Sequence, residues 1–176
     1  MAKLFPEMAA AADSKWRNTA LLVIDMQNDF ILPGGPMHVK GGEAIVPNAI
    51  KAIEVSRSRG IPVIWVVREH DPSGRDVELF RRHLYSAGKP NRLLRAGVGV
   101  KNLVIIGNMS SRLGVQTPNC VRQTVFDAVA LDYETVTVIV DATAAATPDI
   151  HNANISDMRN VGVVIPTLEE WCKVDD

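Results

Sequence analysis

Ala20-Leu21-Leu22-Val23-Ile24-Asp25 is a run of five apolar residues that ends in a carboxylate. The run does not alternate between apolar and polar residues, so we predict a strand that is buried on both faces, as in parallel sheets. Four later runs have the same character, and the last of them is weak. They span residues 61–67, 103–106, 135–140 and 161–165.

Segments with helical periodicity lie between these predicted strands. They span residues 43–59, 76–85, 91–96, 121–133 and 148–160. Strands that alternate with helices predict an α/β fold with a parallel sheet. In such sheets ligands bind beyond the carboxyl ends of the strands, so Asp25 is placed where a site is expected.

The composition fits a single domain. A chain of 176 residues with 47% hydrophobic content can bury a substantial core. We expect residues 1–18 to be an N-terminal tail and residues 19–176 to be the domain. The net charge of -1 argues against a nucleic-acid or membrane-surface partner, and no apolar stretch approaches the roughly 20 residues of a transmembrane helix.

Two cysteines occur, Cys120 and Cys172, without a signal peptide or a metal-binding spacing. This usage predicts no disulfide framework and a reducing, cytoplasmic location. Cys172 follows a short segment without a glycine turn, and we interpret it as structural.

Cys120 follows a turn, Gly114-Val115-Gln116-Thr117-Pro118-Asn119, that leads from a predicted strand into a predicted helix. Thr117 can cap the helix and Pro118 suits its first position. Cys120 would then lie in the first turn, where the helix dipole favours the thiolate. The alternative is an inert, buried cysteine, and position alone leaves both interpretations open.

Asp25 and Cys120 lie 95 positions apart but both follow strands, so a parallel sheet would bring them to one edge. A carboxylate beside a thiol can act first as its general base and then as an acid toward the leaving group. The pair therefore suggests covalent acyl transfer. Asp25 taken alone is equally compatible with a turn or cap residue.

Three segments carry a family resemblance: residues 20–30 with Pro33-Gly34-Gly35, residues 114–121, and Val140-Asp141-Ala142. With them the chain resembles the isochorismatase-like cysteine hydrolases, which include nicotinamidases, N-carbamoyl amidases and ureidoacrylate-type amidohydrolases. Plant or bacterial nicotinamidase-like members are the nearest match, over residues 19–171. The resemblance implies a three-layer Rossmann-like parallel sheet flanked by helices, and a homo-oligomer that acts on a small amide or ureido substrate without a cofactor.

The resemblance also implies a catalytic triad of Asp, Lys and Cys, in which the thiolate attacks the carbonyl and a thioester is hydrolysed. Asp25 and Cys120 match two members. A cis peptide is implied between Val115 and Gln116, and the backbone N–H groups of Gln116 and Cys120 would form the oxyanion hole.

The lysine of the triad has no counterpart. The family carries it on a strand between the equivalents of residues 61–67 and 91–96, but here residues 82–94 contain no such strand. We therefore expect a missing edge strand and impaired catalysis, because loss of a triad member in other hydrolases costs about 10⁴ in rate. Lys89 and Lys101 are the nearby substitutes, and both are better explained as surface lysines.

A second departure is an insertion at residues 108–113, before the turn that carries the nucleophile. A deletion and an insertion together suggest an alternative transcript or gene model. The non-catalytic alternative is a pseudoenzyme that binds a small molecule or sister subunits.

The resemblance implies that Asp29 and Phe30 line or support the substrate pocket, and we expect His70 to be a pocket-side or structural residue. Some nicotinamidases bind a metal near the equivalent of His70, but the other ligands are not found. His38 is alone in a turn, which is weak evidence for a ligand. We predict no metal.

Asp141 and His151 are two further polar residues near the expected site. Asp141 would end the predicted strand 135–140 at the active edge, although a helix-cap or turn role suits it equally. His151, in the following helix, is expected to pack or to form a hydrogen bond rather than to catalyse.

Overall fold

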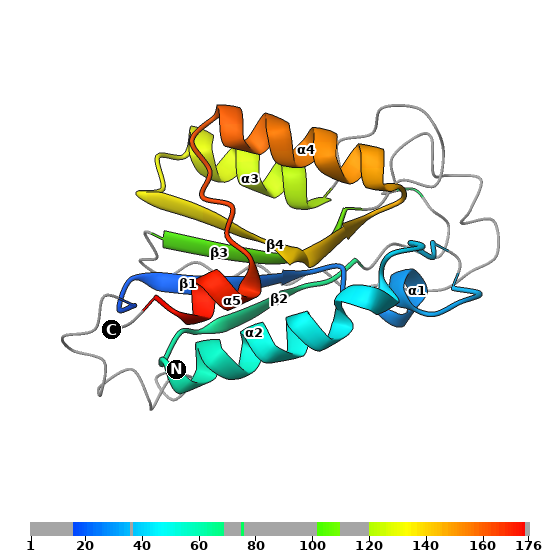
Figure 1. Ribbon diagram of the computed structural model, residues 1–176, viewed down its shortest axis with the longest axis horizontal. Coiled ribbons are helices and arrows are strands. Elements are labelled where there is room, and N and C mark those ends of the chain that lie inside the picture. Colours follow the sequence, from blue (N-terminus) through cyan, green and yellow to red (C-terminus); the bar gives the residue numbers. More distant parts are fainter. Residues whose placement is uncertain (1–15, 36, 69–74, 76–101, 110–119, 175–176) are drawn as a thin grey trace.

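The computed structural model describes residues 16–35, 37–68, 75, 102–109 and 120–174. Within these ranges the chain forms a four-stranded parallel sheet in the order β2-β1-β3-β4. The strands are β1 (Thr19–Ile24), β2 (Val63–Val66), β3 (Asn102–Met109) and β4 (Thr135–Ala145). The expected parallel α/β sheet is present (Figure 1).

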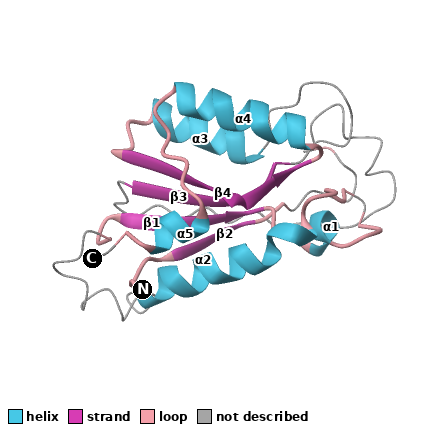
Figure 2. Ribbon diagram, in the orientation of Figure 1, coloured by secondary structure: helices cyan, strands magenta, loops and turns pink. Residues whose placement is uncertain are grey.

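Helices cover both faces of the sheet (Figures 1 and 2). On one face lie α3 (Cys120–Ala130) and α4 (Pro148–Asn160), and on the other lie α2 (Val46–Ser58) and α5 (Leu168–Cys172). The short elements α1 (Asn28–Ile31) and η1 (Glu43–Ile45) lie between β1 and α2 in the chain. The architecture therefore has the three layers that the sequence predicts.

The central strands are apolar throughout because successive residues point to opposite faces. In β1, Ala20 and Ile24 pack in the cluster that includes residues of α3 and α4. Leu21 and Val23 pack in the cluster that includes residues of α2 and α5. All four are essentially inaccessible to solvent, so neither face of β1 tolerates a polar side chain.

Several element boundaries differ from the prediction. β4 continues to Ala145 instead of ending at residue 140, and β3 continues into residues 108 and 109 of the expected insertion. Residues 161–165 form only an isolated bridge, between Val164 and Thr137, rather than a strand. The predicted helices at residues 76–85 and 91–96, like the segment expected to lack the edge strand, lie outside the described residues.

The helix α5 was not predicted, although the sequence contains its signal. Thr167 Oγ1 accepts a hydrogen bond from the Glu170 N–H at 3.2 Å, and Glu170 Oε2 accepts one from the Thr167 N–H at 2.7 Å. This capping box needs only a Ser or Thr followed three residues later by Glu or Gln. A helix of five residues is too short to show a periodic pattern, so the cap was the one available sign.

Part of the expected N-terminal tail belongs to the folded domain. Trp16 is buried and packs edge-on against Trp171, with ring centroids 6.1 Å apart. The guanidinium of Arg59 lies 4.6 Å from the centroid of the Trp16 ring and 5.0 Å from that of Trp171. Residues 16–18 therefore extend the domain beyond the predicted start at residue 19.

Candidate active site

Asp25 is the residue directly after β1, and its backbone conformation is unusual. Its φ of +53° lies in the left-handed region, which Asp tolerates better than most residues. The backbone N–H donates to the Val66 carbonyl oxygen at 2.9 Å, and the residue is only 1% exposed. A buried carboxylate on a strained backbone is typical of functional sites.

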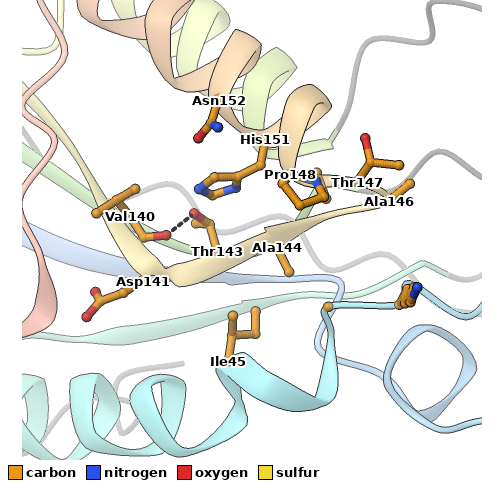
Figure 3. A pocket seen from close by; sticks show the side chains of 13 residues that line it. Ile45, Val140, Asp141, Thr143, Ala144, Ala146, Thr147, Pro148, His151 and Asn152 are labelled. Atoms are coloured by element: carbon orange, nitrogen blue, oxygen red, sulfur yellow. Dashed lines mark hydrogen bonds between the residues drawn. The ribbon is translucent and has the colours of Figure 1, made fainter.

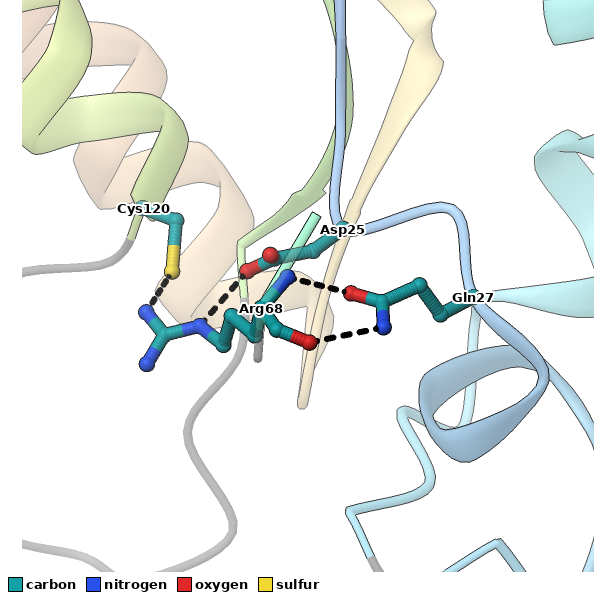
Figure 4. A network of polar contacts seen from close by, with 4 residues as sticks. All are labelled: Asp25, Gln27, Arg68 and Cys120. Carbon is teal, nitrogen blue, oxygen red and sulfur yellow. Dashed lines mark hydrogen bonds and ion pairs between the residues drawn. The ribbon is translucent and has the colours of Figure 1, made fainter. Parts of the chain in front are cut away.

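Arg68 lies two residues beyond the end of β2, next to Asp25 (Figure 4). The side chain of Gln27 binds the backbone of Arg68 at both the N–H and the carbonyl oxygen. Gln27 Oε1 accepts a hydrogen bond from the Arg68 N–H at 2.7 Å, and Gln27 Nε2 donates to the Arg68 carbonyl oxygen at 3.1 Å. This pair of bonds fixes the direction in which the Arg68 side chain leaves the sheet.

The guanidinium of Arg68 bridges Asp25 and Cys120 (Figure 4). Its Nε donates to Asp25 Oδ2 at 3.1 Å, and its Nη2 donates a hydrogen bond to Cys120 Sγ. The side chains of Arg68 and Asp25 are 16% and 2% exposed. The topology thus brings Asp25 and Cys120 to one edge of the sheet, with a cation between them.

Cys120 is the first residue of α3 and is half-buried. Burial raises the pKa of its thiol to about 11, and the neighbouring charge of Asp25 and a hydrogen bond to Asp25 act in the same direction. Arg68 lowers this pKa but does not offset the other effects. The raised pKa favours the thiol, which is opposite to the expectation that the first helical turn favours the thiolate.

The other expected site residues lie partly in the core and partly outside the described ranges. Asp29 is half-buried in α1, and Phe30 is fully buried in a cluster with Met37, Val39, Ile45 and Ala144. Phe30 thus supports the loop after β1 from within the core. The residues Val115, Gln116, His70, Lys89 and Lys101 lie outside the described ranges.

Asp141 acts as a cap in the structure. Its Oδ1 accepts a hydrogen bond at 2.7 Å from the N–H of Leu168, the first residue of α5. Because β4 runs on to Ala145, Asp141 lies within the strand and not at its carboxyl end. Of the two roles that the sequence left open, the helix-cap role is the one observed.

A cavity of about 550 Å³ lies between the second half of β4, the start of α4 and η1 (Figure 3). Its lining includes Lys40, Ile45, Thr143, His151 and Asn152, but none of Asp25, Arg68 or Cys120. Burial lowers the pKa of His151, which favours the neutral imidazole. The cavity is therefore separate in its lining from the Asp25–Arg68–Cys120 cluster.

Sequence reasoning missed Arg68 and Gln27. The rule that placed Asp25 at the carboxyl edge also applies to Arg68, which follows the predicted strand 61–67 directly. The family resemblance implies a lysine at this site, and an arginine does not match it. Gln27 left a weaker signal, since nothing in the sequence shows that its amide faces the backbone of another strand.

Within the described part of the chain, no group of three or more His, Cys, Asp or Glu side chains could hold a metal ion. In the same residues, no helix is long and apolar enough to cross a membrane. Both cysteines, Cys120 and Cys172, are free thiols.

Comparisons with known proteins show the family of this chain. The model of the isochorismatase domain matches residues 19–106 and 92–170, in two overlapping segments. A protein of Arabidopsis thaliana named probable inactive nicotinamidase is 57% identical over 188 residues, covering 89% of this chain and 96% of that protein.

Solved structures show the same fold. An isochorismatase family protein from Desulfovibrio vulgaris superposes with a TM-score of 0.74 at 34% identity, covering 89% of this chain and 97% of that one. The pyrazinamidase of Pyrococcus horikoshii, in complex with zinc, superposes with a TM-score of 0.64 at 22% identity, covering 85% and 99%. At that lower identity the likeness concerns the fold alone.

Proposed function

From the premise that this chain belongs to the isochorismatase family, we propose that it is a cysteine hydrolase that cleaves a small amide or ureido C–N bond, with slow turnover. The observation that carries the proposal is the contact between Asp25 and Cys120 at the carboxyl edge of the sheet. A buried carboxylate hydrogen-bonded to a thiol is the minimum arrangement for nucleophilic attack with general-base assistance.

The chemistry requires Asp25 to transfer one proton in each half of the reaction. As Cys120 Sγ attacks the carbonyl carbon, the thiol proton passes to the Asp25 carboxylate. Asp25 then protonates the leaving nitrogen as the C–N bond breaks, which yields an amine and a thioester. Water attacks the thioester with Asp25 as base, and the acid leaves with the thiol restored. We assign the oxyanion hole to the N–H groups of Gln116 and Cys120, as the family resemblance implies.

Slow turnover follows from the state of the thiol. With a pKa of about 11, about one Cys120 thiol in 10⁴ is ionised at pH 7. The family lysine, which would stabilise the thiolate, is expected to be missing from this chain. The relative named probable inactive nicotinamidase supports a reduced activity.

We further propose that the protein acts in the cytoplasm, as a homo-oligomer, on a small molecule. A nucleophilic thiol has to stay reduced, which favours a reducing compartment for Cys120. Trp65 in β2 is 43% exposed, and its burial by a sister subunit would be favourable because the side chain is large and apolar. Light scattering after size-exclusion chromatography tests the assembly.

Ammonia release from nicotinamide or from a ureido acid tests the hydrolase proposal. Cys120→Ala should abolish release, whereas Cys172→Ala, prepared in parallel, should retain it. This matched pair separates loss of the nucleophile from loss of any thiol and controls for contaminating hydrolases. Full turnover in the Cys120→Ala variant would refute the mechanism.

The pseudoenzyme alternative is favoured by one specific observation, the raised pKa of Cys120. Such a protein would bind the amide without cleaving it. Calorimetry measures the binding of nicotinamide or a ureido acid. Binding without ammonia release above the Cys120→Ala background would support this alternative.

A further inference from the structure

We infer that Arg68 is a catalytic residue of this site, whose guanidinium supplies the fixed positive charge that stabilises the Cys120 thiolate. The inference rests on the proposed function, because it assigns a role within that same site. It concerns a residue outside the triad that the family resemblance implies.

The geometry gives the guanidinium contact with both reacting side chains. Nε donates to Asp25 Oδ2 at 3.1 Å, while Nη2 donates to Cys120 Sγ. One planar group therefore contacts the base and the nucleophile at the same time, through two different nitrogens (Figure 4). A surface arginine paired only with a carboxylate would leave the thiol untouched.

Charge balance explains why the site needs a cation. The Asp25 carboxylate beside the thiol opposes thiolate formation, since two adjacent negative charges repel in a medium of low dielectric constant. The guanidinium remains protonated at any working pH, so it offsets the carboxylate charge without titrating. An opposite charge at this range typically shifts a pKa by about 1 to 3 units.

The same property limits what Arg68 can do. A lysine ammonium can give up and regain a proton, but the guanidinium cannot. Arg68 therefore stabilises the thiolate and the charge that develops during attack, while Asp25 carries every proton. This division of roles distinguishes the site from one built with a lysine.

Gln27 is a positioning residue for Arg68. It contacts neither reacting side chain in the described hydrogen bonds, but binds the Arg68 backbone at the N–H and at the carbonyl. Arginine loses rotamer entropy when it is fixed, so a backbone that is already held makes the bridge to Asp25 and Cys120 easier to form.

Alkylation by iodoacetamide without substrate tests the role of Arg68. Mass spectrometry follows the peptide with Cys120, and the peptide with Cys172 is the internal reference. At pH 9 we expect Arg68→Gln to react about tenfold more slowly at Cys120 than the parent, with a pH midpoint about one unit higher. Arg68→Lys should recover part of the rate, because it restores the charge.

The matched control is Arg122→Gln. Arg122 lies two residues after Cys120 in α3, but it pairs with Asp157 at 3.0 Å and contacts solvent. Its removal should leave the alkylation rate within about twofold of the parent, because an exposed charge is screened. An equal loss in both variants would reduce the effect of Arg68 to general electrostatics and overturn the inference.

Arg68→Gln that reacts as fast as the parent, with an unchanged midpoint, would also overturn it. Should circular dichroism show that this variant does not fold, Gln27→Ala provides the test. This variant keeps the charge but frees the Arg68 backbone. We expect alkylation of Cys120 to be at least threefold slower, and an unchanged rate would contradict the role of Arg68. Because no substrate is present, these outcomes are independent of ammonia release and of the proposed hydrolysis.

Discussion

Replacing Gly107 with alanine should destabilise the chain and disturb the candidate site together. Gly107 lies in β3 opposite Ile24 of β1 and has a φ of +133°. A Cβ at this position would lie 2.8 Å from the carbonyl carbon of Ile24, 2.9 Å from its nitrogen, and closer still to its oxygen. These are backbone atoms that cannot rotate away, so the two strands would have to separate directly beside Asp25.

The expected magnitude has two parts. A side chain at such a φ costs about 1 to 3 kcal/mol, and overpacking between strands costs about 1 to 3 kcal/mol more. Gly162 provides a matched control, because its φ is +86° and a Cβ there would have no atom within 4 Å. Gly162→Ala should show only the conformational cost, and the difference between the two variants measures the clash.

Urea unfolding followed by far-UV circular dichroism measures both free energies of unfolding. Iodoacetamide labelling of Cys120 under native conditions reports on the site. We expect Gly107→Ala to lose about 1 to 3 kcal/mol more than Gly162→Ala and to alter the labelling rate. Equal destabilisation by both substitutions would show that β1 and β3 do not approach as closely as described.

Three further predictions concern other parts of the chain. Arg59→Met should cost about 2 to 3 kcal/mol and change tryptophan fluorescence, because Arg59 contacts the rings of Trp16 and Trp171 and donates to three backbone carbonyls; Arg59→Lys should lose less. Asp141→Ala should cost about 1 kcal/mol in urea unfolding through the lost cap and leave Cys120 labelling unchanged, whereas slower labelling would place Asp141 in the site. For His151, burial lowers the folded-state pKa below 6.5, so the unfolded chain binds the proton more readily and stability should fall as the pH drops through 6.5. His151→Gln should flatten that dependence in thermal unfolding scans, and an unchanged slope would contradict the assignment.

The layered fold could be predicted from the sequence because the central strands are buried on both faces. A run such as residues 20–24 has no polar position, and this pattern is typical of a strand that is buried between two helical layers. The end of β4 could not be predicted in the same way. Asp141 interrupts the apolar run and indicates a boundary, yet the strand continues through it, with Asp141 exposed and its carboxylate bonded to the N–H of Leu168.

Half of the candidate site could be predicted by the same route. Asp25 and Cys120 follow strands, and the parallel topology places strand ends together whatever the distance in sequence. The protonation state could not be predicted, because it depends on how deeply the thiol is buried and on which charges surround it. Desolvation of Cys120 is the largest cause of its raised pKa, and the position of a cysteine at a helix start does not reveal it.

The register of the sheet explains why the cation is Arg68 rather than a lysine from another strand. Ile24 of β1 pairs with Val66 of β2, so residues just beyond each partner meet at the same edge. Asp25 follows Ile24 directly, and Arg68 follows Val66 by two residues, close enough for its long side chain to reach back to the carboxylate and on to Cys120. The position of the charge is thus set by β2, a neighbour of β1 within the described sheet. A chain without the lysine strand would keep an electrostatic partner for its thiol but lose the partner that exchanges protons, and this distinction would account for the slow turnover that we propose.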